Sequence, residues 1–217
     1  MPTDTAKLLD AWSELMPSQR ELGEDLIRRY SEPHRRYHTV DHLAYVLDRI
    51  DEFAVSSSDL FMVRLAAWFH DAVYAIPTRE LTNEEASARL TVASLIDAGM
   101  DQEDINEVTR LVRLTATHVP PPGDRNGSLL CDADLAILGA PPEVYQAYAE
   151  AVRAEYAHVP DRDFAVGRLE ILQRLLERSI YRTTKGRRLT AQAHANLTAE
   201  STALAADLGV DLEHFFR

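Results

Sequence analysis

The chain has 217 residues, and its 35 acidic against 23 basic side chains give a formal net charge of −12. With 46% hydrophobic and 27% charged residues, the composition excludes wholesale disorder. The negative charge repels phosphate backbones and excludes a protein that wraps nucleic-acid polymers. A small phosphorylated ligand remains compatible, because a metal ion can supply local positive charge inside an acidic protein.

The sequence features that bear on cellular location favour the cytoplasm. The single cysteine, Cys131, excludes an internal disulfide and suits a reducing compartment. The first ten residues contain neither a basic leader nor an apolar stretch, so we expect no signal peptide. The longest uninterrupted apolar run, residues 65–69, is far shorter than the ~20 residues of a membrane span. We therefore expect a cytoplasmic protein without a membrane partner.

Helix signals dominate the chain. Glycine and proline together make up about 8% of the residues, below the roughly 12% of average usage, which favours long helices. Ser18 with Glu21 and Thr82 with Glu85 form capping boxes, which mark helix starts. Apolar residues at helical spacing then predict further helices. The predicted helices cover residues 18–30, 39–50, 59–69, 82–99, 101–118, 128–138, 141–156, 161–181 and 190–208.

Two further segments shape the predicted architecture. The helix predicted at 59–69 is apolar on nearly every side and should be central and buried. Residues 120–127 contain three prolines and two glycines, and we interpret them as a surface loop rather than a domain linker, because site residues lie on both sides. The prediction is a single all-α domain over residues 1–217, a bundle of about eight to ten helices.

Four separate places put His or Asp on or beside these helices. His38 and His42 are four residues apart, so on a helix they would project from one face. His70 and Asp71 follow the most apolar helix, where an unpaired charge would cost several kcal/mol or more. The remaining two places are residues 115–118 and 132–134. A lone His at a helix end is more often a surface residue, and a lone Asp at a helix start is usually a cap.

In chain order, these residues are similar to the H…HD…D signature of the HD-domain metal-dependent phosphohydrolases. The signature here is His42, His70 with Asp71, and Asp134. The flanking sequence resembles one subgroup of predicted phosphohydrolases, from about residue 35 to residue 196. Its matching blocks are Arg36–Thr39, Trp68–Tyr74, Asn83-Glu84 with Ser87-Ala88, Thr115–His118, Asp132–Gly139 and Val152–Tyr156. The resemblance implies a helical HD-type fold.

The resemblance also implies a metal site formed by the four signature residues, with Asp71 both a ligand and a catalytic residue. Two imidazoles and two carboxylates suit one ion of Mn²⁺, Fe²⁺, Co²⁺, Ni²⁺ or Zn²⁺ better than Mg²⁺, and a second ion stays open. Asp134 is the expected ligand because the family usually takes its last ligand from an Ala-Asp pair. Asp132 then either supports the ligands or is a charge at a helix N-terminus.

Other candidate residues follow from the same resemblance. His38 resembles the first histidine of the His-x-x-x-His motif in cyclic-nucleotide phosphodiesterases and would act as general acid, or alternatively support a ligand or bind substrate. Glu84 would orient the attacking water or hold a second ion, unless it only complements a helix dipole. His118 is a candidate for substrate binding or a second metal position. By position rather than by resemblance, Arg36 beside the first histidine motif and Lys185 in a turn that could close over a ligand are the first candidates to bind phosphate.

The implied activity is hydrolysis of a phosphate ester of a nucleotide or another small phosphorylated metabolite, by a water bound to the metal ion. The loop at 75–81 should shape the substrate pocket, while Trp68 and Cys131 should be core residues. One alternative is a phosphodiesterase or pyrophosphohydrolase that acts on cyclic or polyphosphorylated nucleotides. Another is a non-catalytic sensor that binds a nucleotide. The oligomeric state stays open, with a homodimer among the options.

Overall fold

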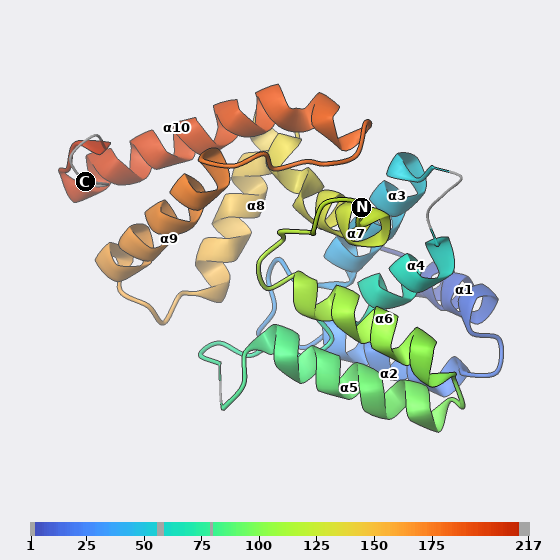
Figure 1. The fold of residues 1–217 in the computed structure, drawn as a ribbon. Coiled ribbons are helices and arrows are strands. Elements are labelled where there is room, and N and C mark those ends of the chain that lie inside the picture. Colours follow the sequence, from blue (N-terminus) through green and yellow to red (C-terminus); the bar gives the residue numbers. More distant parts are fainter. Residues whose placement is uncertain (1–2, 56–58, 79, 213–217) are drawn as a thin grey trace. The chain divides into compact units, whose positions relative to one another are not determined.

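The computed structural model describes residues 3–55, 59–78 and 80–212. Within this part of the chain, ten α-helices and two 3₁₀ helices form and no strand does (Figure 1), which confirms the predicted all-α class. Across the same residues, no helix combines the length and the hydropathy that are needed to span a bilayer. Contacts between residues group the chain into two compact units, one ending at Asp134 and the other beginning at Leu135.

The first unit contains seven of the α-helices found among the described residues. They are α1 (Thr5–Leu15), α2 (Arg20–Tyr30), α3 (Val40–Phe53), α4 (Leu60–Phe69), α5 (Asn83–Asp97), α6 (Gln102–Leu114) and α7 (Arg125–Asp134). Helix α4 packs against α3, α5, α6 and α7 and is the centre of this unit. Most of its residues are buried, as its apolar sequence predicts. Four helices therefore hold α4 in place, and this packing fixes the positions of His70 and Asp71, which follow Phe69.

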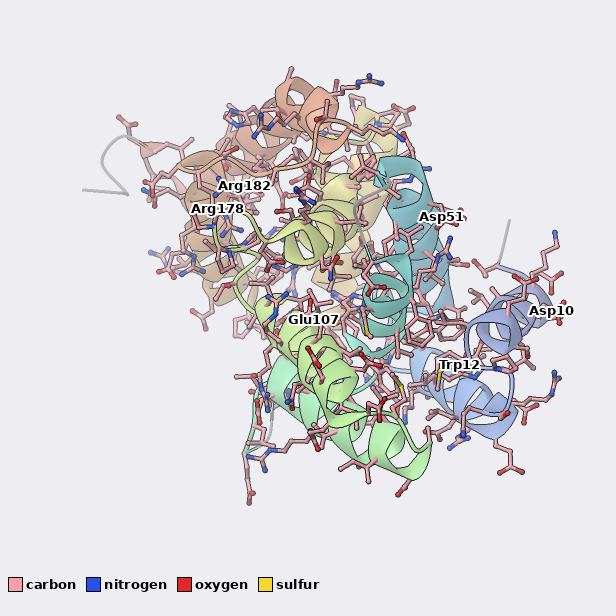
Figure 2. The ribbon with its side chains drawn as sticks, turned by 45° about the vertical axis from the view of Figure 1, so that its right-hand side comes forward. Asp10, Trp12, Asp51, Glu107, Arg178 and Arg182 are labelled. Carbon is pink, nitrogen blue, oxygen red and sulfur yellow. The ribbon has the colours of Figure 1, made fainter. Side chains whose placement is uncertain are left out.

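An aromatic contact joins α1 to this core. Trp12 on α1 (Figure 2) is fully buried. Its ring packs against that of Trp68 on α4 in an edge-to-face arrangement, with the ring centroids 5.0 Å apart. Helix α2 approaches Trp12 at Gly23, where an added Cβ would lie 2.2 Å from the Trp12 Cδ1 atom. The Trp12 indole donates a hydrogen bond to the carbonyl of Gln19. The predictions that Trp68 and Cys131 are buried are confirmed.

The second unit contains η1 (Leu135–Gly139), α8 (Pro142–Glu155), α9 (Asp161–Leu176), η2 (Gly186–Leu189) and α10 (Thr190–Leu208). Helix α10 packs along α9 and against η1. The buried Arg168 on α9 donates to both carboxylate oxygens of Glu200 on α10. The buried Asn196 side chain donates to the carbonyls of Leu138 and Ala140, which ties α10 to the residues at the end of η1.

Several predicted helix boundaries are confirmed and others are wrong. Thr39, Asp59 and Thr82 cap α3, α4 and α5 with their side chains, as predicted. Ser18 does not cap α2, which begins two residues later behind Gln19 and has no side-chain cap. The helix predicted to reach residue 181 ends at Leu176. The helix predicted to reach residue 118 ends at Leu114, and the one at 128–138 is α7 followed by η1.

Candidate metal centre

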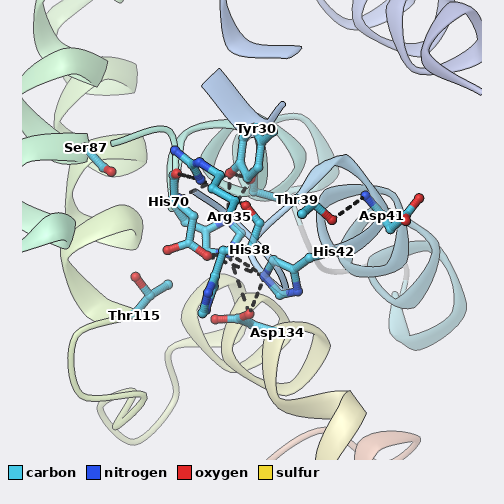
Figure 3. A network of polar contacts seen from close by, with 12 residues as sticks. Tyr30, Arg35, His38, Thr39, Asp41, His42, His70, Ser87, Thr115 and Asp134 are labelled. Atoms are coloured by element: carbon cyan, nitrogen blue, oxygen red, sulfur yellow. Dashed lines mark hydrogen bonds and ion pairs between the residues drawn. The ribbon is translucent and has the colours of Figure 1, made fainter. Parts of the chain in front are cut away.

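Three separate segments of the first unit bring the four signature residues together, and Figure 3 labels His42, His70 and Asp134 among them. His42 lies in the first turn of α3 and is 4% exposed, and His70 caps the C-terminus of α4 and is 1% exposed. Asp71 follows His70 directly, and Asp134 is the last residue of α7. Because α4 is fixed inside the helical core, His70 and Asp71 are held in place by packing.

The imidazole nitrogens of this cluster lie close to each other and to both carboxylates. The two Nε2 atoms of His42 and His70 are 3.2 Å apart. The Asp71 Oδ2 atom lies 3.5 Å from the first and 3.1 Å from the second. The Asp134 Oδ1 atom lies 3.2 and 3.6 Å from the same two nitrogens. Neighbouring ligands about 2.1 Å from a metal ion are about 3.0–3.4 Å apart, so three of these five distances fall in that range and the other two are longer. The group His42, His70 and Asp71 could hold a metal ion.

The orientation of the imidazoles also fits a metal ion. The Nδ1 atom of His70 lies 2.7 Å from the Ala67 carbonyl oxygen, which can only accept, so this nitrogen carries the proton. The lone pair of the neutral ring then lies on Nε2, which faces the cluster. Within the described residues, the buried His42 Nδ1 atom has no hydrogen-bond partner. Two neutral imidazoles and two carboxylates together carry a charge of −2, which one divalent cation neutralises.

The cluster shifts the pKa values of its own members. Burial raises the pKa of Asp71, but the charge of His70 and then that of His38 outweigh burial and hold it well below its ordinary value. Burial acts in the same direction on Asp134, whose pKa is also held well below its ordinary value by His70 and by hydrogen bonds from His118 and others. Burial lowers the pKa of His70, but Asp71 raises it well above its ordinary value. Both carboxylates are therefore ionised at neutral pH.

Tyr30, the last residue of α2, supports the ligand pair from behind. Its fully buried hydroxyl accepts a hydrogen bond from the Asp71 backbone N–H at 3.2 Å and lies 3.5 Å from the His70 Nδ1 atom. Burial raises the pKa of Tyr30 to about 12, so the hydroxyl stays neutral. The sequence analysis missed Tyr30, because a single tyrosine at a helix end carries no signal of its own.

Side chains of α5 bind the backbone of the segment that follows Asp71. The Asn83 amide exchanges hydrogen bonds with the backbone N–H and carbonyl of Ala75. The Ser87 hydroxyl does the same with the backbone of Val73. Asn83 and Ser87 are four residues apart and share one helix face, so both side chains can reach the same backbone segment. The Asn-Glu…Ser-Ala block thus has a structural role at its Asn and Ser positions.

His38 lies beside the cluster but not on the helix that carries His42. Helix α3 begins at Val40, so the prediction that both histidines share a helical face is wrong: Thr39 caps α3 in an extended conformation. The two rings still approach each other, with centroids 5.5 Å apart. The His38 ring also stacks on Tyr74 at 4.2 Å, which fixes its orientation.

His118 holds the outer oxygen of Asp134. Its Nε2 atom donates to the Asp134 Oδ2 atom at 2.7 Å, while Oδ1 of the same carboxylate faces His42 and His70. The residue follows α6 and has a φ of 52°, in the left-handed region. This conformation turns the chain after α6 and brings the imidazole to Asp134.

The remaining predicted residues lie in different surroundings. Glu84 is half-buried in the first turn of α5, and both interpretations of it stay open. Arg36 is exposed and donates to the carbonyls of neighbouring residues. Lys185 belongs to the second unit, directly before η2. Asp132 is fully buried near the C-terminal end of α7, so its interpretation as a helix N-terminal charge is wrong.

A cavity of about 1050 Å³ lies next to the ligand-bearing turn. The chain that follows Asp71 forms much of its wall, including Ala72, Tyr74 and Ile76. Arg29 and His34, from α2 and the residues after it, add basic groups to the lining. All described residues of the predicted pocket loop 75–81 line this cavity, while Arg79 lies outside the described residues.

No protein-family model matches the chain, and neither a curated protein nor a solved structure is significantly similar to it.

Proposed function

We propose that the chain is a metal-dependent phosphohydrolase of the HD-domain type, which hydrolyses a phosphate ester of a nucleotide or another small phosphorylated metabolite. One observation carries the proposal: the nitrogen and carboxylate atoms of His42, His70, Asp71 and Asp134 converge at 3.1–3.6 Å in a buried site. The order of these residues along the chain supports the same reaction class, because it matches the H…HD…D signature.

The four converging side chains would hold one divalent transition-metal ion. Such an ion supplies Lewis acidity, which activates water and stabilises the charge of a phosphoryl group. The mixed nitrogen and oxygen donors favour Mn²⁺, Fe²⁺, Co²⁺, Ni²⁺ or Zn²⁺ over Mg²⁺. His118 orients Asp134 through their hydrogen bond, and Tyr30 orients Asp71 through its backbone N–H.

His38 is the proposed general acid. Its imidazole is held beside His42 by stacking on Tyr74, and it is only partly exposed. From there it would give its proton to the oxygen of the leaving group, a role that suits an imidazole near neutral pH. The cavity lined by the chain after Asp71 offers space for the organic part of a small substrate.

Metal analysis and a phosphatase screen test the proposal. The purified native protein should bind about one equivalent of Co²⁺ or Mn²⁺ and release phosphate from members of a nucleotide panel. Asp71→Ala should lose both properties, while Asp51→Ala, which removes an exposed carboxylate of α3, should keep them. Full activity of Asp71→Ala would refute the proposal. Nucleotide binding without turnover would favour a sensor, and product analysis separates esters from diesters and pyrophosphates.

A further inference from the structure

We infer that Arg35 is a positioning residue for the metal centre, which holds the two ligand-bearing segments around His42 and Asp71 in register with each other. The inference rests on the proposed metal site. It concerns a side chain that the sequence marks only as one of several basic residues near the first histidine motif.

The Arg35 guanidinium is buried, unlike that of a typical surface arginine. The residue is 3% exposed, and its side chain is inaccessible to solvent. Its carbon Cζ lies 5.2 Å from the centroid of the Tyr30 ring and 5.4 Å from that of the Tyr74 ring. The carboxylate that pairs with it, Glu32, is at 3.2 Å and is itself partly exposed. A cation that is buried to this extent needs further acceptors.

Backbone carbonyls of the two ligand segments provide these acceptors. The Nη1 atom donates to the carbonyl of His38 at 3.0 Å and to that of Asp71 at 2.8 Å. The Nη2 atom donates to the carbonyl of Ala72 at 3.3 Å. One planar group therefore bonds the residue before the α3 cap and the turn after α4, which are more than 30 residues apart in the chain.

This arrangement transmits position rather than charge. His42 lies four residues after His38, whose carbonyl Arg35 binds. Arg35 also binds the backbone carbonyl of Asp71, whose side chain is a proposed ligand. A shift of either segment breaks a charge-assisted hydrogen bond to the guanidinium. Lysine preserves the charge but not the planar fork, so it cannot bond the three carbonyls together. Arg35→Lys therefore separates the positioning role from the charge.

Two measurements test Arg35→Lys against Arg168→Lys, which changes a buried arginine of the second unit that binds Glu200 and Tyr148. In metal-free protein, hydrogen exchange should become faster in peptides that cover residues 38–43 and 70–75 of Arg35→Lys only. In a Co²⁺ titration, the affinity of Arg35→Lys should fall about 10-fold or more, and its visible absorption spectrum should change. Added methylguanidinium should restore Co²⁺ affinity to Arg35→Ala.

The outcomes separate the two proposals. Unchanged exchange in both peptides together with native Co²⁺ affinity in Arg35→Lys would overturn the positioning role. An equal loss of Co²⁺ affinity in Arg168→Lys would also overturn it, because the effect would then follow from lower stability. If the native protein binds no Co²⁺, the proposed function fails, and the exchange measurement on metal-free protein alone decides the role of Arg35.

Discussion

Metal binding at the cluster should release about one proton and should strengthen as the pH rises, because ligand imidazoles must be neutral. Burial lowers the pKa of both histidines, but the nearby carboxylates outweigh it. The charge of Asp71 raises the pKa of His70, and hydrogen bonds to Asp134 and Asp71 raise the pKa of His42. With the two Nε2 atoms 3.2 Å apart, two cationic rings would repel each other. The pair therefore carries one proton more than two neutral imidazoles do, and not two more.

The window for this effect follows from the directions of the shifts. Between the ordinary carboxylate value of 3.8 and the ordinary imidazole value of 6.5, Asp71 and Asp134 are ionised and the histidine pair keeps its proton. The dissociation constant for Co²⁺ should decrease about tenfold for each pH unit gained in this window. Calorimetry in two buffers of different ionisation enthalpy counts the proton. His158→Ala, which removes an exposed imidazole of the second unit, should show the same slope.

The stability of the metal-free protein should show the same shifts. The raised imidazole pKa values stabilise the fold below 6.5, and this contribution disappears as the pH rises through the raised values. The depressed carboxylate pKa values stabilise it above 3.8, and this contribution disappears as the pH falls through the depressed values. Thermal unfolding with Co²⁺ or with a chelator measures both. A Co²⁺ affinity and a Co²⁺-induced stabilisation that stay constant with pH would refute the reasoning.

Three further predictions concern residues of the helices. Glu200→Ala leaves the buried Arg168 cation without its carboxylate. Urea unfolding should show a free energy of unfolding that is lower by roughly 3–5 kcal/mol. A change below about 0.5 kcal/mol would contradict the contribution assigned to this pair. Gly23→Ala should cost at least about 1–3 kcal/mol, because its Cβ would overlap Trp12. Gly167→Ala, whose Cβ would meet no atom within 4 Å, should instead stabilise α9 by about 0.5–1 kcal/mol.

Helices were predictable from the sequence where local chemistry decides them. Thr39, Asp59 and Thr82 each cap a helix with a side-chain oxygen, and α4 is apolar enough to be identified as the central helix. The boundaries that failed depend on tertiary packing. Ser18 and Glu21 have the spacing of a capping box, but α2 begins behind Gln19, whose carbonyl accepts the Trp12 indole N–H. The capping-box pattern does not contain that contact.

The cluster of His42, His70, Asp71 and Asp134 could be predicted because burying His70 and Asp71 in apolar surroundings needs a compensating partner. Most of the residues that hold these side chains in place were not predictable. Tyr30 and Arg35 act on the Asp71 backbone, and a backbone partner leaves no pattern of residue types in the sequence. His118 was singled out, but for substrate binding or a second metal ion rather than for its hydrogen bond to Asp134. Asn83 and Ser87 are four residues apart on one helix face, and their partners became evident only from the fold.

The number of available protons distinguishes a metal site from a buried network of ion pairs. Five contacts of 3.1–3.6 Å join two Nε2 atoms to each other and to two carboxylate oxygens. Each Nε2–H can point at one acceptor, so the two rings can satisfy at most two of these five contacts with protons at a time. A single cation held by His42, His70 and Asp71 would satisfy the contacts among these three side chains together, which is the argument for a metal ion at this site.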